Sequence, residues 1–443
     1  MIKIDSTKSF CPKCMKIINA DVISKRGTVY IKKKCDEHGV FQSRHSWDKE
    51  KVYRTMADVP KNESPDSLVL HLTSRCNQHC SFCYAMANER GNRYELSKKD
   101  IEKNLKQFKG EWVLLSGGEP TVRDDIFDVI KIIKKMKFKA LLCTNGKKLV
   151  DEEYVKKLKD AGLDIVNLQF DTFSDKNYVL FRGEPLLYKK MKVIENLKKY
   201  KINTILFVMV IKNRNMKEIK SIMDFVEKNK DCIKVVYFER AWKVGRNPNH
   251  KETYCSDIID GIRTQIKIEE DEIIESANFC HYLQSILKKI NGTNAIENPG
   301  CELNCYVILY KNRVIPLTRI VCVQELNKML KFIYGNKSSI VLKTIISTPY
   351  AFYVIFKSFI EKQYFKILLS ELIKGCGNIS SKILFYSPFI QLKIRIEPEV
   401  EDIDLNILKN YNLYSDNPNG EKIVPAYFRH MESNKLRNKC QKK

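Results

Sequence analysis

A regular alternation of short apolar runs with amphipathic stretches, between Leu68 and about Arg246, is the feature that most restricts the fold of this chain. The apolar runs have the length of buried strands, and the stretches between them repeat apolar residues with the period of a helix. Strands that alternate with helices predict a parallel sheet of repeated βα units. The expected strands are Leu68–Leu72, Trp112–Ser116, Ala140–Cys143, Ile165–Phe170, Thr204–Val210 and Ile233–Phe238. The expected helices are Lys98–Phe108, Asp125–Met136, Glu152–Ala161, Leu187–Lys199 and Lys217–Lys228.

Right-handed crossovers would curl such a sheet into a barrel, with functional groups at the carboxyl ends of the strands. The predicted fold class is therefore α/β, with a partial (β/α)6 TIM-like barrel at residues 59–250. A linker rich in Pro, Asn and Ser (Val59–Asp66) separates it from a small N-terminal domain at residues 1–58. Residues 251–443 are expected to form an α+β domain that holds an auxiliary cluster or the substrate.

The chain contains 15 cysteines, and eight of them lie in three groups: Cys11, Cys14 and Cys35, then Cys76, Cys80 and Cys83, then Cys301 and Cys305. Its N-terminus has no apolar signal-peptide core, and no uninterrupted apolar run is long enough to cross a bilayer. We therefore expect a cytoplasmic protein, in which clustered cysteines are metal ligands more often than disulfides.

The central group has the spacing C-x3-C-x2-C (Cys76, Cys80, Cys83) and directly follows the first expected strand. Three thiolates on one loop can bind three irons of a cubane cluster and leave the fourth iron open to a small chelating ligand. The alternatives are a zinc knuckle with His79 as the fourth ligand, or chance clustering of the three cysteines.

A second motif, Ser116–Pro120 (SGGEP), follows the second expected strand. Gly117 and Gly118 allow a close approach of the backbone. The Glu119 carboxylate could accept a hydrogen bond from an ammonium group, or it could hold the loop in place.

Together, the cysteine loop and the SGGEP motif resemble the radical S-adenosylmethionine (radical SAM) superfamily. The resemblance implies a catalytic [4Fe–4S] cluster on Cys76, Cys80 and Cys83, with SAM bound at the open iron. It also implies contacts with SAM or its pocket from residues that could otherwise be ordinary strand-end turns: Phe82 near the adenine, Gly117, Gly118 and Glu119 at the amino group, then Thr144, Asn145, Gln169 and Asp171.

The chemistry that this resemblance implies is radical chemistry. One electron, from a low-potential donor such as ferredoxin or flavodoxin, would cleave SAM. The resulting 5′-deoxyadenosyl radical would abstract hydrogen from an unactivated carbon, with the protein supplying orientation and the exclusion of water. The protein is therefore expected to be an enzyme of transferase or oxidoreductase type.

Two further cysteine groups flank the central one. Cys11, Cys14, Cys35 and His38 have the pattern C-x2-C…C-x2-H, which suits a tetrahedral structural site for Zn or mononuclear Fe. Cys301 and Cys305 could hold an auxiliary [4Fe–4S] cluster, with Cys280 as a third ligand and Cys322 or Cys376 as a fourth. For the last two, buried or free thiols are the competing interpretation.

The resemblance is strongest to the branch that contains the archaeal tetraether lipid synthase and the class D radical SAM methylases. The features that fit this branch are the N-terminal segment, Asp171, Arg182–Gly183, Gly245–Arg246, and Cys301 and Cys305 followed by Val314–Arg319. Tyr411 and Tyr427 stand where relatives carry cysteines, so one auxiliary cluster is expected to be lost.

Three functions remain open at this point. The first is modification of an unactivated C–H position, with C–C bond formation on a lipid: the apolar segment Ile340–Phe365 could line a lipid groove or touch a membrane, or form a buried helix pair. The second is a methylase or peptide-modifying enzyme that binds a pterin or a peptide. The third is a non-enzymatic metal-cluster protein that binds nucleic acid. The net charge of +25 favours anionic partners, but the lysines are scattered and form no dense basic arm, so nucleic acid is not expected.

Overall fold

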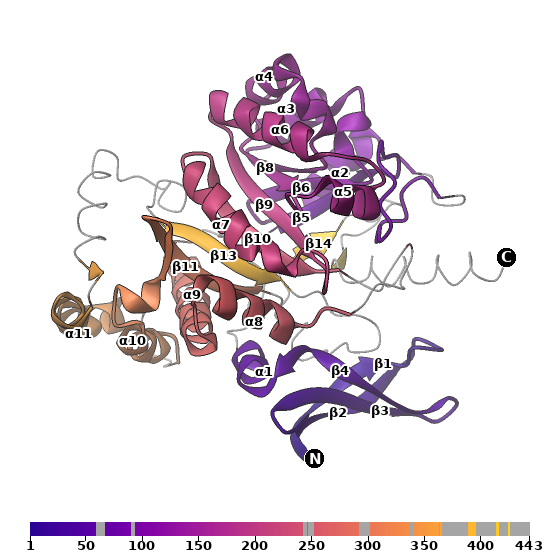
Figure 1. Cartoon of the computed structure of the whole chain (residues 1–443). Helices are drawn as coiled ribbons and strands as arrows, with labels where there is room; N and C mark the ends of the chain where they lie inside the picture. The colour runs from indigo at the N-terminus through magenta and orange to yellow at the C-terminus, as the bar shows by residue number, and fades with distance from the viewer. Residues whose placement is uncertain are drawn as a thin grey trace.

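The computed structural model describes residues 1–58, 67–89, 94–241, 246, 252–291, 302–335, 340–362, 364–365, 389–395, 413–415 and 424–425. These residues form two sheets, one of four strands and one of eleven (Figure 1).

The N-terminal domain is an antiparallel meander in the order β1-β2-β3-β4, followed by a short helix. Its elements are β1 (Ile2–Phe10), β2 (Ile17–Lys25), β3 (Thr28–Cys35), β4 (Gly39–Lys49) and α1 (Glu50–Ala57). Buried Asp48 joins this domain to the rest of the chain, because its carboxylate accepts hydrogen bonds from the backbone N–H and the hydroxyl of Ser256 at 2.9 and 2.6 Å.

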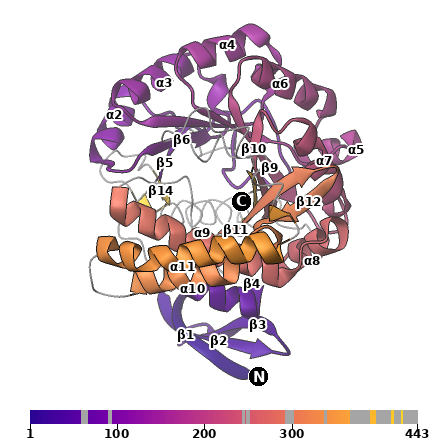
Figure 2. The same ribbon diagram turned by 90° about the vertical axis from the view of Figure 1, so that its left-hand side faces the viewer.

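The predicted parallel sheet is confirmed, and its six strands lie side by side in chain order. They are β5 (Ser67–Thr73), β6 (Trp112–Gly117), β7 (Lys139–Thr144), β8 (Ile165–Gln169), β9 (Asn203–Val210) and β10 (Ile233–Arg240). The connecting helices are α2 (Lys98–Gln107), α3 (Ile126–Lys135), α4 (Glu152–Asp160), α5 (Asp175–Arg182), α6 (Leu187–Lys199) and α7 (Ile219–Lys228). Figure 2 shows helices α2, α3, α4, α6 and α7 along the outside of an arc of strands. Helix α5 was not predicted.

Strands from the C-terminal half extend this sheet at both edges. At one edge β13 (Phe389–Arg395) pairs in parallel with β10, and β11 (Glu302–Tyr310) and β12 (Arg313–Pro316) follow it. At the other edge β14 (Leu413–Ser415) pairs in parallel with β5 and precedes β15 (Val424–Pro425). Over the described residues the sheet stays open, as a partial barrel. Because β11, β12 and β13 belong to the same sheet as β5–β10, the sheet contains strands from both sides of residue 250. The domain boundary at that residue remains a prediction.

Four helices of the C-terminal half lie near the N-terminal domain and the β11 edge (Figures 1 and 2). They are α8 (Cys255–Ile266), α9 (Glu270–Asn291), α10 (Val323–Gly335) and α11 (Ile340–Glu361). Among the described helices, none combines the length and the apolarity that a bilayer crossing requires. Phe352 and Phe356 of α11 are nevertheless exposed, at 68% and 65%.

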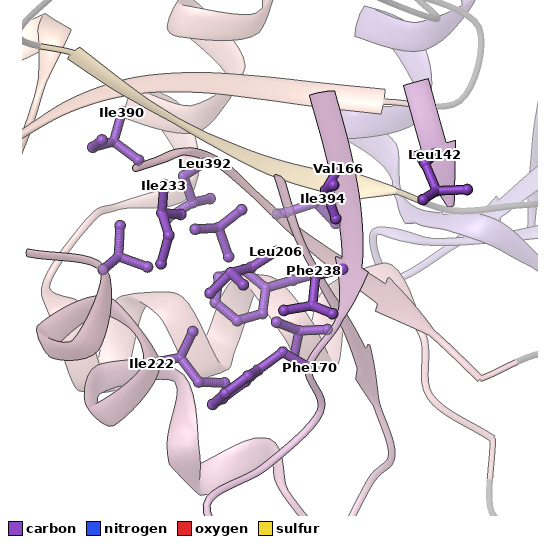
Figure 3. Close-up of a cluster of buried hydrophobic side chains, with 14 of the residues drawn as sticks. Leu142, Val166, Phe170, Leu206, Ile222, Ile233, Phe238, Ile390, Leu392 and Ile394 are labelled. Carbon is purple, nitrogen blue, oxygen red and sulfur yellow. The ribbon is translucent and has the colours of Figure 1, made fainter. Parts of the chain in front are cut away.

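The two faces of the curved sheet have different side chains because successive residues of a strand point to opposite sides. On the outer face, apolar residues of five strands pack together and against Ile222 of α7 (Figure 3). Each fully buried side chain of this kind contributes about 1.5–3 kcal/mol. On the inner face, Trp112, Leu141, Ile165, Ile205 and Val235 form an apolar layer. Polar residues follow them toward the carboxyl ends of the strands, and this is where the cavity lies.

Candidate active site

The cysteine loop begins directly after β5 and is tied down on both sides. The side chain of Asn88 donates to the Cys76 carbonyl at 2.8 Å and accepts from the Cys76 N–H at 3.0 Å. Arg246 donates to the carbonyls of Cys80 and Ala87 at 2.9 and 2.6 Å, and it forms an ion pair with Glu89 at 2.8 Å. These contacts fix the loop without using a thiol.

The two glycines of the SGGEP motif let the loop after β6 pack directly on the cysteine loop. A Cβ on Gly117, whose φ is +124°, would lie 2.5 Å from the Thr73 carbonyl oxygen, and one on Gly118 would lie 2.3 Å from that of Arg75. The Gly118 N–H donates to Thr73 O at 2.7 Å. The close backbone approach expected here is therefore an approach between two loops of the protein.

Glu119 is almost completely buried, and its carboxylate joins its own loop to the end of β7. One oxygen accepts from the Thr121 N–H and from the hydroxyls of Thr121 and Thr144, at 3.1, 2.6 and 2.7 Å. The other accepts from the Asn145 N–H at 2.7 Å. This arrangement favours the alternative stated above, in which Glu119 holds the loops in place. Asn145 extends the network, because its amide donates to the Asn77 side chain in the cysteine loop at 2.8 Å.

Asp171 does not line the cavity and is fully buried beneath it. It holds Arg182 of α5 through two hydrogen bonds of 2.8 and 3.0 Å. The Arg182 guanidinium lies 3.3 Å from Cys80 Sγ and 4.8 Å from the centre of the Phe82 ring. From the sequence, Arg182 was expected only to fit the methylase-like branch, and no role beside the cluster was predicted for it. The sequence pattern predicts no helix where α5 lies, so nothing indicated that Arg182 would point toward the cysteine loop.

Lys190 is a site residue that sequence reasoning missed. Its buried ammonium group donates to the carbonyls of Asn145 and Gln169 at 2.6 Å each and to Gln169 Oε1 at 2.8 Å. Burial lowers the pKa of Lys190 to about 7. A lysine within an amphipathic helix carries no sequence signal that would distinguish it from a solvated one.

One cavity of about 270 Å³ opens at the carboxyl ends of these strands. Ten of the eleven residues predicted for the cluster and SAM line this cavity: Cys76, Cys80, Phe82, Cys83, Gly117, Gly118, Glu119, Thr144, Asn145 and Gln169. Residues not predicted for the site also line it, among them Gln78, Asn167, Phe207, Met209, Glu239 and Arg395.

The donor set of this cavity fits an iron–sulfur cluster and a polar ligand. None of the three thiols is in a disulfide. Burial, with the Glu119 charge nearby, raises the pKa of Cys76 to about 12, and burial also raises that of Cys83. A metal cation is what converts such buried thiols to thiolates. In the same wall, the buried Gln78 Nε2 has no hydrogen-bond partner within the described part of the chain.

The N-terminal group forms a compact site. The ligand atoms of Cys11, Cys14, Cys35 and His38 all lie within 4.8 Å of one another. Cys35 Sγ is 3.5 Å from His38 Nδ1 and 3.9 Å from Cys14 Sγ. Three sulfurs and one imidazole at these separations fit a single tetrahedral ion.

Cys280 and Cys305, two of the cysteines predicted to hold an auxiliary cluster, do not line the cavity. Cys305 lies on β11 in the apolar core of the outer face, where burial raises its pKa to about 12. Cys280 of α9 is buried 3.8 Å from the Asn304 carbonyl oxygen. Cys301, Cys376, Tyr411 and Tyr427 lie outside the described residues, so the auxiliary cluster stays a prediction.

Comparison with known proteins gives two family matches. The model described as "Radical SAM superfamily" matches residues 70–226, and the "HMPTM N-terminal zinc ribbon domain" matches residues 3–45. The chain is 35% identical over 365 residues to 7,8-dihydro-6-hydroxymethylpterin dimethyltransferase of Methanocaldococcus jannaschii, which covers 73% of this chain and 72% of that protein.

Other matches are shorter. Fe-coproporphyrin III synthase of Methanosarcina barkeri is 30% identical over 191 residues, or 42% of this chain and 47% of that protein. Among solved structures, SuiB of Streptococcus suis bound to S-adenosylmethionine has a TM-score of 0.39 and 22% identity, over 46% of this chain and 47% of that one.

Proposed function

The chain belongs to the radical SAM superfamily, in a methylase-like branch with an N-terminal zinc ribbon, and on that premise we propose that it methylates a carbon of a small heterocycle of the pterin type. It is a radical SAM enzyme and uses a [4Fe–4S] cluster and SAM. The similarity that supports the substrate class spans 365 residues and so extends well beyond residues 70–226, the part common to the superfamily.

The observation that carries the proposal is that the cysteine loop and the SGGEP loop line the same cavity. We assign Cys76, Cys80 and Cys83 as the cluster ligands. Held there, the cluster and SAM would supply the one-electron radical chemistry that removes a hydrogen atom from an unactivated carbon.

The remaining residues bind and orient. Phe82 offers an apolar ring to the adenine, and the amide groups of Asn145 and Gln169 offer polar contacts to SAM. Glu119 and Lys190 act as positioning residues, since each joins neighbouring loops at the carboxyl ends of the strands.

An anaerobic assay tests the proposal. The reconstituted enzyme receives SAM as the radical source and excess dithionite as the source of electrons for both SAM cleavage and methyl transfer. It also receives a reduced hydroxymethylpterin deuterated at its carbon-bound positions and a methyl source, which is a second equivalent of SAM in one arm and a methylene-bearing reduced pterin carrier in the other. We expect 5′-deoxyadenosine that carries deuterium, together with a methylated pterin, and neither product with the C80A variant. Formation of 5′-deoxyadenosine without deuterium transfer, or methylation that persists in C80A, would contradict the proposal.

A lipid substrate, which the sequence analysis favoured, is not supported by the names of these relatives. The M. jannaschii relative is named for a pterin substrate, so it does not support a peptide substrate either. Lipid extracts serve as competing substrates in the same deuterium assay. For the electron donor we propose a low-potential flavodoxin or ferredoxin, which is tested by replacing dithionite with the reduced donor protein.

A further inference from the structure

The wall of the cavity farthest along the sheet from the cysteine loop carries two opposite charges. The loop follows β5, whereas Glu239 and Arg395 lie near the carboxyl ends of β10 and β13, with β6 to β9 between. Glu239 and Arg395 are direct partners in the parallel register, and both line the cavity. Parallel strands bring their carboxyl ends to one edge, which is where ligands bind in sheets of this kind.

This pair is an ion pair and not a short hydrogen bond. Arg395 Nε is 3.8 Å from Glu239 Oε2. The Glu239 side chain is 1% exposed and that of Arg395 is 16% exposed. A buried carboxylate beside a guanidinium presents an acceptor and a fork of donors side by side to whatever enters this end of the cavity.

Lys393, the nearest buried charge to the pair on β13, belongs to a separate network behind it. Lys393 lies two residues before Arg395, and its ammonium nitrogen is 3.2 Å from both Glu302 Oε2 and the Tyr237 hydroxyl. Lys393 and Glu302 thus neutralise each other below the cavity, since neither residue lines it. Of the charged side chains that line the cavity among the described residues, Glu239 and Arg395 are the two at this end of the sheet.

The surface next to the pair is apolar and suits a flat ring. Phe207 and Met209 of β9 line the cavity beside Glu239, and Leu114 and Cys143 lie in the same lining. Phe207 also packs on Tyr237, with ring centres 5.9 Å apart. A planar heterocycle could lie on this surface with its polar edge toward β10 and β13.

We propose that Glu239 and Arg395 are the specificity-determining pair of the substrate subsite, and that they select a planar heterocycle with an amidine-type edge beside a carbonyl oxygen. A ring N–H and an adjacent exocyclic NH2 would donate to the two oxygens of Glu239, while Arg395 would donate to the carbonyl oxygen. The 2-amino-4-oxo edge of a pterin has this pattern, so the inference rests on the proposed function and deepens it.

Direct binding tests this inference without any turnover. The reconstituted holoenzyme is titrated, without reductant, into fluorescent 6-hydroxymethylpterin and into lumazine, which has an oxygen in place of the 2-amino group. We expect the wild type to prefer the pterin, and E239Q to lose affinity for it by about 10- to 100-fold, as expected when a charge-assisted pair of hydrogen bonds is lost. The affinity of E239Q for lumazine should differ little from that of the wild type. The ratio of pterin affinity to lumazine affinity should therefore be smaller in E239Q than in the wild type.

The matched control is E153Q, a change of the same chemistry at an exposed position of α4, which should bind both ligands as the wild type does. Iron content and thermal unfolding of E239Q establish that it is folded, and an equal loss of affinity for both ligands would overturn the inference. If the wild type methylates the pterin and E239Q binds it unchanged, only the role of this pair is overturned. If the wild type binds no pterin, the substrate class and the pair are overturned together.

Discussion

The Arg182 guanidinium lies 3.3 Å from Cys80 Sγ while two hydrogen bonds hold it on the Asp171 carboxylate. A buried cation therefore stands beside one of the three proposed cluster ligands. A positive charge near a cluster stabilises the reduced form, which carries one more electron, and so raises the reduction potential.

This arrangement predicts that R182M lowers the midpoint potential of the cluster, by on the order of tens of millivolts. R182K keeps the charge but loses the paired hydrogen bonds, so it should fall between R182M and the wild type. A redox titration followed by EPR measures the potential. Identical potentials in all three proteins would mean that Arg182 does not act on the cluster.

His281 of α9 predicts a dependence of stability on pH. Burial lowers its pKa to about 4 from an ordinary value of 6.5, and Nε2 donates to the Glu302 carbonyl at 3.3 Å. Between these values the unfolded chain binds more protons than the folded one, so the contribution of this residue to stability falls as the pH drops from about 6.5 to 4. The full loss is about 3 kcal/mol.

The H281Q variant keeps a side-chain donor without a titrating group. Urea unfolding at pH 7 and pH 5 measures the effect, and we expect the wild type to lose more stability between these values than H281Q does. If both proteins respond to acid by the same amount, His281 is not the titrating group.

Most of the parallel sheet could be predicted because each strand is a short apolar run bounded by turn residues, and local pattern suffices for that. Helix α5 (Asp175–Arg182) was missed because it is short and weakly amphipathic. The place of β13 could not be predicted either. Ile390–Ile396 reads as a strand, but nothing local indicates that it pairs with β10, about 150 residues earlier.

The site residues likewise divide into those that local sequence motifs predict and those that depend on tertiary packing. Ten predicted residues share the cavity because motifs on successive strand ends meet at one edge of a parallel sheet. Glu239 was missed because the predicted strand ended at Phe238, one residue before it. Extending the inward-facing alternation of Val235 and Tyr237 by one more step would have found it. Lys190 and Arg395 depend on tertiary packing and have no comparable signal.

The contact between the two glycines and the cysteine loop predicts that G118A disrupts the site. The new Cβ would lie 2.3 Å from the Arg75 carbonyl oxygen, and backbone on both sides must move. We expect a loss of stability of at least about 1–3 kcal/mol and SAM binding weakened by 10-fold or more. G335A is the control, since a Cβ there meets nothing within 4 Å. Isothermal titration with SAM and thermal unfolding give the two readouts, and wild-type values for G118A would contradict the prediction.

The N-terminal site predicts that one cysteine substitution removes zinc without removing iron. In C35S the set Cys11, Cys14 and His38 keeps three ligands, too few for the closed tetrahedral coordination of a structural zinc. Because zinc binding contributes to folding, the meander β1–β4 should become sensitive to protease. Metal analysis by mass spectrometry should show zinc lost and iron unchanged.

C232S is the matched control, because Cys232 is a buried thiol of the barrel whose Sγ lies 3.2 Å from the Thr204 hydroxyl, a polar neighbour that suits serine. Zinc retained in C35S, or iron lost along with it, would show that this site is not an independent zinc ribbon.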